Sequence, residues 1–320
     1  MMRRHSANPI ISRADIPDVD KHVRDVSSVF NPGAIKFQGR YFLALRVQTR
    51  GRETVLMPAY SDNGIEFEIP AELIEIKGLD RVPQKLYHVY DPRLTEIEGV
   101  VYMMFAADTN DGCRLGTACS TDLVHWELAG FGGEDDTRNG VLFPERRGGA
   151  YLRLERPNLD IPGGGPPTGS EIIVSESLDL ASWRQTGSVM AGRPHYWDEL
   201  IGSGPPPVKT REGWLHLYHG VATHFQSVNI YQAGVILLDL EDPGWIVSRG
   251  RDNILEPREL YELAGQVPNV VFPSGIIVED CDSEGFALPD SRVLVYYGAA
   301  DTCVGVAETT IKELLAASKD

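Results

Sequence analysis

The chain has 320 residues and a formal net charge of −16, because 46 acidic side chains outnumber 30 basic ones. A chain this acidic lacks the basic face that a phosphate backbone requires, so we expect no nucleic-acid partner. No apolar stretch approaches the length of a membrane span, and no apolar signal segment follows the N-terminal arginines, so we expect a cytoplasmic protein without a membrane contact.

An apolar, aromatic-rich strand recurs along the chain, and a turn leads into each copy. The copies are predicted over residues 39–45, 99–105, 149–154, 213–218 and 291–297. The turn contains Gly in every copy except the last, where Ser-Arg replaces it. Short strands separated by Gly- and Pro-rich turns are typical of an all-β fold.

A second sequence motif recurs with the same period as the strand. A Ser, followed within two residues by an Asp and then by an aromatic ring, occurs over residues 61–67, 120–126 and 177–183, with a degenerate copy over 239–245. The rings are about 60 residues apart, which is enough for four short strands, or one propeller blade. We therefore predict a five-bladed β-propeller that forms one domain over residues 1–320, with a short C-terminal helix near 310–317. The alternative is a β-sandwich or a two-domain β protein, although such folds rarely keep this register.

Asp91 is the first candidate for chemistry. It stands ahead of the second blade's inner strand, between Tyr90 and Pro92, with Arg93 close behind. Pro92 keeps Asp91 out of the helical region and so fixes its direction. Ligands of propellers bind at one end of the central channel, where the loops of successive blades converge. We interpret Asp91 as a candidate catalytic acid; the alternative is a turn-starting residue, since Asp-Pro is common there.

Basic side chains recur near equivalent ends of successive blades. Each one alone is more typical of a solvated or ion-paired surface group. Several of them converging on a channel, in a protein of charge −16, indicate an oxyanion ligand such as phosphate or a carboxylate. The candidates are Arg46, Arg114, Arg146, Arg156, Lys209 and His219, with Arg147 as the alternative to Arg146.

Polar and aromatic residues suggest that the other part of the ligand is a sugar. Asn31 precedes the first blade's opening strand and Asp301 ends the last blade's strand, so the two can share one site where the ring closes. Amides and carboxylates bind sugar hydroxyls, and aromatic rings stack on sugar C–H faces. The ring candidates are Tyr90, Tyr218, Tyr231, Trp197 and His195, and core packing is the alternative for the Tyr and Trp residues.

Metal and cofactor chemistry find little support. The four cysteines show neither metal-ligand spacing nor a disulfide framework, which indicates reduced thiols. His195 and His219 do not stand at paired metal-ligand spacing. We therefore expect no metal and no cofactor.

Several short motifs follow one another in a fixed order. They are Phe-Asn-Pro-Gly-Ala at 30–34, Tyr-Asp-Pro-Arg at 90–93, Leu-Phe-Pro-Glu at 142–145, Arg-Pro at 156–157, Gly-Ser-Gly-Pro-Pro-Pro-Val-Lys-Thr at 202–210 and Tyr-His-Gly at 218–220. This set resembles glycoside hydrolase family 130, the β-mannoside phosphorylases and related β-mannosidases. The resemblance runs from about residue 5 to the last blade. Its most specific parts are the Gly-Pro-Pro-Pro-Val-Lys-Thr and Tyr-His-Gly motifs.

The resemblance implies a five-bladed propeller and inverting phosphorolysis of a β-mannosidic bond. Inorganic phosphate would be the co-substrate, and α-mannose 1-phosphate the product. Asp91 would be the catalytic acid, acting through the 3-hydroxyl of the bound mannose. The other implied roles are mannose binding by Asn31, Arg46 and Asp301, acceptor contact by Tyr90 and Tyr231, and phosphate binding by Arg114, Arg146, Arg156, Lys209 and His219. Relatives often assemble as homo-oligomers, so a homo-oligomer is possible here.

Three alternatives remain open. An inverting hydrolase needs a second carboxylate to deprotonate water, whereas phosphate is already an anionic nucleophile that needs a cationic pocket. One well-placed acid and a basic set favour the phosphorylase over an inverting β-mannosidase that would use Asp301 or Glu145 as the base. A family 43-like glycosidase needs an opening Asp where Asn31 stands. A carbohydrate-binding propeller without activity gives no reason for the basic set.

Overall fold

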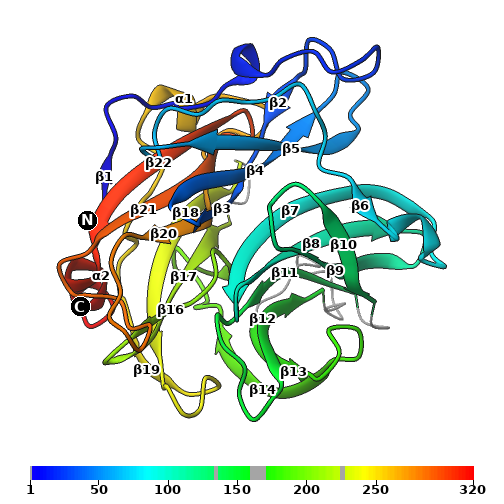
Figure 1. Cartoon of the computed structure of the whole chain (residues 1–320). Coiled ribbons are helices and arrows are strands. Elements are labelled where there is room, and N and C mark those ends of the chain that lie inside the picture. The colour runs from blue at the N-terminus through cyan, green and yellow to red at the C-terminus, as the bar shows by residue number, and fades with distance from the viewer. Residues whose placement is uncertain (1, 133–135, 159–170, 224–227) are drawn as a thin grey trace.

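The predicted propeller is confirmed. The computed structural model describes residues 2–132, 136–158, 171–223 and 228–320. Its strands form five sheets, which can be followed clockwise around a ring from the blue strands at the top of Figure 1. We number these sheets blades 1 to 5 in chain order.

The strands of each blade are nearly all antiparallel, and the first long strand lies innermost. Blade 1 contains β2 (Ser28–Val29), β3 (Gly33–Phe37), β4 (Arg40–Gln48) and β5 (Thr54–Ser61). Blade 2 contains β6 (Ile76–Lys77), β7 (Leu86–Ile97), β8 (Val100–Thr109), β9 (Gly112–Ser120) and β10 (Trp126–Phe131). Blade 3 contains β11 (Thr137–Leu142), β12 (Tyr151–Pro157), β13 (Glu171–Ser177) and β14 (Arg184–Ala191).

The last two blades complete the ring. Blade 4 contains β15 (Leu200–Ser203), β16 (Val208–Thr210), β17 (Gly213–Ala222), β18 (Ile230–Leu238) and β19 (Ile246–Arg249). Blade 5 contains β20 (Val271–Val278), β21 (Arg292–Ala299), β22 (Cys303–Thr310) and, as its outer strand, β1 (Arg3–Arg4). The short helical elements are η1 (Arg13–Asp15), η2 (Leu79–Arg81), α1 (Leu260–Leu263) and α2 (Ile311–Ala317). The predicted C-terminal helix is α2, which begins at the capping residue Thr310.

The repeated Ser-Asp phrase is the turn that follows the third long strand of a blade. In blade 2, Ser120 Oγ accepts from the Leu123 amide at 2.9 Å, and Asp122 Oδ1 accepts from the His125 amide at 2.8 Å. Trp126 then donates its indole N–H to the Leu123 carbonyl at 3.2 Å. Leu123 itself has a φ of 64°, so the turn depends on these local bonds to hold a left-handed residue.

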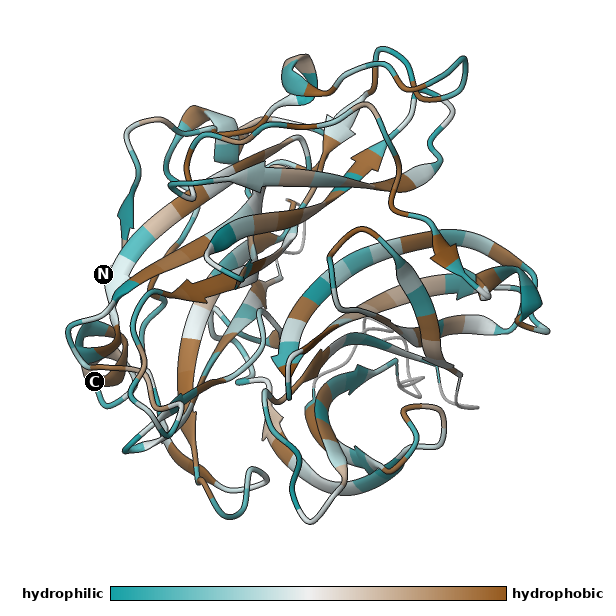
Figure 2. Cartoon of the chain, in the orientation of Figure 1, coloured by the Kyte–Doolittle hydropathy of each residue, from teal (hydrophilic) through white to brown (hydrophobic). Residues whose placement is uncertain are grey.

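Apolar side chains fill the spaces between neighbouring blades. Figure 2 shows brown, hydrophobic segments mainly along the strands. Between blades 4 and 5, for example, buried Leu217 and Val295 belong to one cluster, and between blades 5 and 1 Leu294 packs with Leu43. Each blade therefore uses both faces for packing, and the polar ligand site is left to the channel.

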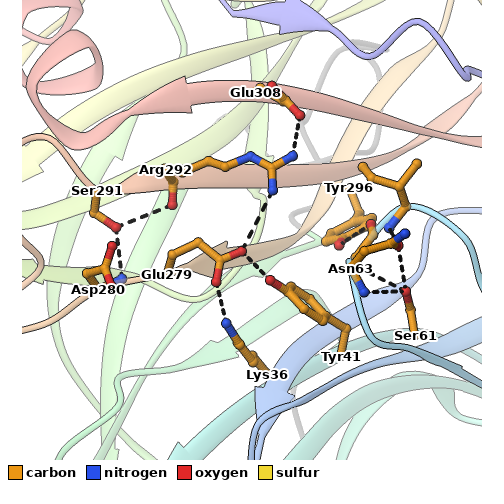
Figure 3. Close-up of polar contacts among 12 residues, drawn as sticks. Lys36, Tyr41, Ser61, Asn63, Glu279, Asp280, Ser291, Arg292, Tyr296 and Glu308 are labelled. Carbon is orange, nitrogen blue, oxygen red and sulfur yellow. Dashed lines mark hydrogen bonds and ion pairs between the residues drawn. The ribbon is translucent and has the colours of Figure 1, made fainter.

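A polar network adds to the contact between the last and first blades. Glu279, just after β20, accepts from Lys36 and Tyr41 of blade 1 and lies 4.0 Å from Arg292 of blade 5 (Figure 3). Nearby, the Tyr296 hydroxyl donates to the carbonyl of Gly64, in the first of the repeated turns, at 2.7 Å. Together with the pairing of β1 and β22, these contacts close the ring.

Candidate active site

Asp91 lies at an irregular point of the innermost strand of blade 2. The register of β7 against β8 shifts between Tyr90 and Arg93, and Asp91 has a left-handed φ of 55°. Its Oδ1 accepts from Arg46 Nη1 at 2.7 Å and from Asn31 Nδ2 at 3.1 Å. Both donors belong to blade 1, so the bulge aims the carboxylate at side chains across a blade boundary.

The charges around Asp91 favour its ionised form. Burial alone would raise the pKa of Asp91, but the charges of Arg46 and Arg93 and the hydrogen bond from Asn31 outweigh burial and lower it. The Arg46 guanidinium is itself held between two rings, 4.4 Å from the centroid of Phe30 and 4.9 Å from that of Tyr90. Asp91 is thus a carboxylate at neutral pH.

A second group of side chains is cationic or donates hydrogen bonds. Arg156, near the end of β12, is 8% exposed, and burial and the charge of Arg138 lower its pKa. Tyr231 lies within electrostatic range of both arginines and of Asp301. His219, 2% exposed, stacks on Phe272 with ring centroids 4.4 Å apart. Burial and the charge of Arg156 lower the pKa of His219 well below its usual value, so its ring is neutral at pH 7.

Several polar atoms in this group are buried without a hydrogen-bond partner. Within the described residues they are Nε of Arg138, Nε of Arg156, Nδ1 of His219 and Oδ1 of Asn139. The absence of a side chain at Gly202 allows His219 and Asn139 to pack closely against it. A Cβ at this position would lie 2.4 Å from His219 Cε1 and 2.6 Å from Asn139 Oδ1. Buried nitrogen donors left unpaired are expensive, so the nitrogens of Arg138, Arg156 and His219 are suited to an anion that would accept their bonds.

Asp301 faces the same region from the end of blade 5. Ala300 and Asp301 have left-handed φ values of 47° and 49°. Burial, with the nearby charge of Asp91, raises the pKa of Asp301 to about 6, although the charge of Arg46 opposes the rise. The pKa values of the two carboxyls are thus shifted in opposite directions, as expected for neighbouring acids in one site.

An open pocket of about 390 Å³ adjoins this constellation. It is lined by Arg46, Gln48, Arg52, Thr54, His88, Tyr90, Asp108 and Arg138. Tyr90 is fixed on its wall, because its hydroxyl donates to Asp108 Oδ1 at 2.7 Å and lies 3.4 Å from Cys113 Sγ. Arg114, next to that cysteine, is buried and donates to its carbonyl at 3.1 Å. A larger pocket of about 980 Å³ lies on the outer side of blades 1 and 2, away from these groups.

Three predicted site residues lie elsewhere. Arg146 stacks on Tyr151 at 4.3 Å and lies 3.8 Å from Glu98, which follows the far end of β7. Since Glu98 comes seven residues after Asp91, this is roughly 20 Å along the strand. The structure therefore does not bring Arg146, a predicted phosphate ligand, together with Asp91. Its neighbour Arg147 is no replacement, because it lines outer pockets with Gly148 and Glu176.

Lys209 and His195 also fall outside the constellation. Lys209 pairs with Glu145 at 2.5 Å and is in register with Trp214, five positions before His219 and so roughly 16 Å away along β17. His195 is exposed in the loop between β14 and β15, with a left-handed φ of 58°.

The sequence did contain a signal for Arg138 and Asn139, which were not among the predicted site residues. Asn31 stands at the start of an inner strand, and the equivalent start in blade 3 is the segment with Arg138 and Asn139, where the register of β11 shifts. Arg146 follows the other end of that same strand.

Within the described ranges, no group of three His, Cys, Asp or Glu side chains is arranged to hold a metal ion.

Comparison with known proteins agrees with this geometry. The model of the family described as beta-1,4-mannooligosaccharide phosphorylase, glycoside hydrolase family 130, matches residues 1–320. The chain belongs to glycoside hydrolase family 130. It is therefore an enzyme of a family that contains β-mannoside phosphorylases. The alternative assignment to a family 43-like glycosidase is excluded.

Individual family 130 relatives match over most of their length. The 1,2-beta-oligomannan phosphorylase of Thermoanaerobacter sp. (strain X514) is 32% identical over 298 residues, covering 90% of this chain and 92% of that protein. The beta-1,4-mannooligosaccharide phosphorylase of Ruminococcus albus is 30% identical and covers 98% and 89%. The structure of the beta-1,2-mannobiose phosphorylase of Listeria innocua, with beta-1,2-mannobiose, has a TM-score of 0.82 at 25% identity and covers 99% of each chain.

Proposed function

We propose that the protein is an inverting phosphorylase that cleaves a β-mannosidic bond with inorganic phosphate and releases α-mannose 1-phosphate. The observation that carries the proposal is the set of buried, unpartnered nitrogens of Arg138, Arg156 and His219 beside Asp91. Phosphate offers the several acceptor oxygens that these donors lack, and an arginine fork suits its geometry. The names of the relatives support phosphorolysis over hydrolysis.

The mannose would lie between this donor set and the carboxylates. Asn31, Arg46, Asp91 and Asp301 offer amide, guanidinium and carboxylate groups to sugar hydroxyls. Tyr90, fixed by Asp108, would face the acceptor sugar in the adjoining pocket. Phosphate held on the opposite side of the anomeric carbon could attack in line, which inverts the configuration.

The proton balance assigns Asp91 its role. Attack forms the bond from a phosphate oxygen to the anomeric carbon and breaks the bond from that carbon to the glycosidic oxygen. Asp91 gives its proton to the mannose 3-hydroxyl, whose own proton passes to the leaving oxygen. The charges of Arg46 and Arg93 favour the ionised form of Asp91, but phosphate bound nearby would add a like charge, and a like charge raises the pKa of a carboxyl. The co-substrate thus promotes protonation of its own catalytic acid.

An inverting β-mannosidase of the same fold is the competing candidate. One observation favours it: Asp301 has a pKa of about 6, so it is ionised at neutral pH and could deprotonate a water. Glu145, the other base considered, is paired with Lys209 away from Asp91. The buried donor set has no role in hydrolysis, which is why phosphorolysis is preferred.

The test runs the reaction in the direction of synthesis. The protein is incubated with α-mannose 1-phosphate and, separately, mannose, glucose, N-acetylglucosamine or mannobiose as the acceptor, and phosphate release is measured. Release with at least one acceptor supports the phosphorylase and identifies the acceptor. Absence of release with every acceptor, together with cleavage of a β-mannobiose in phosphate-free buffer, identifies the β-mannosidase.

A further inference from the structure

Arg93 is a buried cation whose role the proposed reaction has not used. It lies on β7, two residues after Asp91, and is 0% exposed. Within the described residues it forms no ion pair at salt-bridge distance, and its Nη2 is buried without a hydrogen-bond partner. Burial lowers the pKa of Arg93, and the charge of Asp91 offsets this effect only in part. Burying an arginine in this way is costly, so a function is the natural explanation.

Its hydrogen bonds tie together strands from different blades. Nη1 donates to the main-chain carbonyl of Asp91 at 2.9 Å, and Nε donates to the carbonyl of Gly204 in blade 4 at 2.8 Å. The guanidinium also lies 5.6 Å from the ring centroid of Phe272 in blade 5. Phe272 is the ring on which His219 stacks. One side chain therefore connects the backbone of Asp91 to two other blades across the channel.

The backbone at Asp91 needs such support. A non-glycine residue with a φ of 55° is in a sparsely populated conformation, which persists only where the surroundings hold it. On the blade 1 side the peptide is already crowded, since a Cβ at Gly33 would lie 3.0 Å from the Pro92 carbonyl oxygen. On the other side the fork of Arg93 holds the Asp91 carbonyl.

We propose that Arg93 is a positioning residue for the proposed reaction. Its fork fixes the left-handed backbone from which the Asp91 carboxyl projects, and its charge keeps that carboxyl ionised until phosphate binds. This rests on the proposed function, because it takes Asp91 as the group that exchanges the proton. Arg93 acts through Asp91 and contacts no reacting atom.

The charges around Asp91 determine how removal of Arg93 should change the protonation of the Asp91 carboxyl. Arg46 and Arg93 favour the ionised carboxyl, as does His219 wherever its ring is protonated, whereas Asp301 and Asp91 disfavour each other's charge. Loss of the Arg93 charge leaves Arg46, together with the charge of Arg156, acting on the carboxyl. The Asp91 carboxyl then takes up a proton at higher pH.

A carbon-13 NMR titration tests this directly and does not depend on activity. The protein is labelled at aspartate carboxyl carbons, and the Asp91 signal is the one missing from Asp91→Asn. In Arg93→Met the midpoint of this signal should rise by roughly one pH unit or more. Arg93→Gln serves as a second neutral variant if Arg93→Met does not fold. A midpoint equal to that of the wild type in a folded neutral variant would overturn the proposal.

Two control variants separate positioning from general stability. Arg153 is also a buried arginine, paired with Glu155 at 2.7 Å and stacked at 4.0 Å on Trp183 in blade 3. Arg153→Met should destabilise the fold but leave the Asp91 midpoint unchanged. Arg93→Lys keeps the charge and loses the fork, so its midpoint should also stay unchanged. A shift in Arg153→Met equal to that in Arg93→Met would mean a purely structural effect.

The synthesis assay adds the kinetic part. Arg93→Lys should lower kcat roughly 10- to 100-fold, because the carboxyl is misplaced, while KM for α-mannose 1-phosphate changes less than about threefold. A kcat equal to that of the wild type contradicts the positioning role. If the wild type releases no phosphate at all, the proposed function fails, and the titration still decides what Arg93 does to Asp91.

Discussion

Basic side chains at the two ends of the propeller differ in how their charge is met. At the Asp91 end, Arg156 and His219 are buried and Arg138 is partly exposed, 3.7 Å from Asp108, yet each has a buried ring or guanidinium nitrogen without a partner in the described structure. At the other end, Arg146 and Lys209 are partly exposed and engage Tyr151, Glu98 and Glu145. The same residue types thus serve a ligand at one end and the surface at the other. Unmet hydrogen-bonding capacity, rather than charge alone, distinguishes the two.

The largest effect is expected at the carboxylate that the buried cations surround. Asp91→Asn removes the proton donor without changing the size of the side chain, so turnover should fall roughly 1,000-fold or more. The change is measured as kcat in the synthesis direction, with circular dichroism to show that the fold is kept. Near wild-type turnover in a folded Asp91→Asn protein would show that another group transfers the proton.

The buried cations should come next, and their effect should depend on phosphate. Arg156→Met removes a buried donor at the proposed phosphate position, so KM for phosphate in phosphorolysis should rise, and kcat/KM should fall roughly 100-fold. The KM for the mannoside should change much less. An equal loss for both substrates would place Arg156 at the sugar instead.

The sequence predicted the blades well because their signals are local. The turn at Ser120 and Asp122 is held by bonds within a few residues, so its spacing marks each blade directly. Asp91 could be singled out as a candidate for a similar reason, since Pro92 restricts the conformation of its neighbour. In both cases the information lies within one short segment.

The placement of basic residues could not be predicted in the same way. Whether Arg138 or Arg146 faces the channel depends on the direction of β11 and on the register shift between Arg138 and Val141. The role of Arg93 depends on Gly204, which is 111 residues away in the chain. Contacts of this kind appear only when the blades are assembled.

Asp301 offers a stability test of the Asp91 end. Its pKa in the folded protein is about 6, above the ordinary 3.8, so the folded state binds the proton more tightly than the unfolded chain. Stability should therefore fall as pH rises from about 4 to 6, and the cost is complete above pH 6. Since one pKa unit corresponds to about 1.4 kcal/mol, Asp301→Asn should raise the free energy of unfolding at pH 7 by up to about 3 kcal/mol.

Urea unfolding of Asp301→Asn and the wild type at pH 3.5 and pH 7 measures this effect. The two proteins should differ at pH 7 and agree closely at pH 3.5, where the carboxyl is protonated in both states. A difference that is the same at both pH values would show that the substitution acts through packing or hydrogen bonding instead.

The smallest effects are expected at the opposite end of the propeller. Arg146→Met and Lys209→Met remove exposed charges that are already paired, so kcat and KM for phosphate should stay within about twofold of the wild type. These variants are the matched controls for Arg156→Met. A rise in KM for phosphate in either one, comparable to that of Arg156→Met, would remove the distinction between the two ends.

The most direct test of the central claim follows one β-mannobiose by proton NMR with and without phosphate. The β-1,2- and β-1,4-linked disaccharides are each incubated with the protein in phosphate buffer and in a phosphate-free buffer. The account predicts that α-mannose 1-phosphate forms from at least one of them, and only where phosphate is present. Release of free mannose at the same rate in both buffers would contradict it and would make the enzyme a hydrolase.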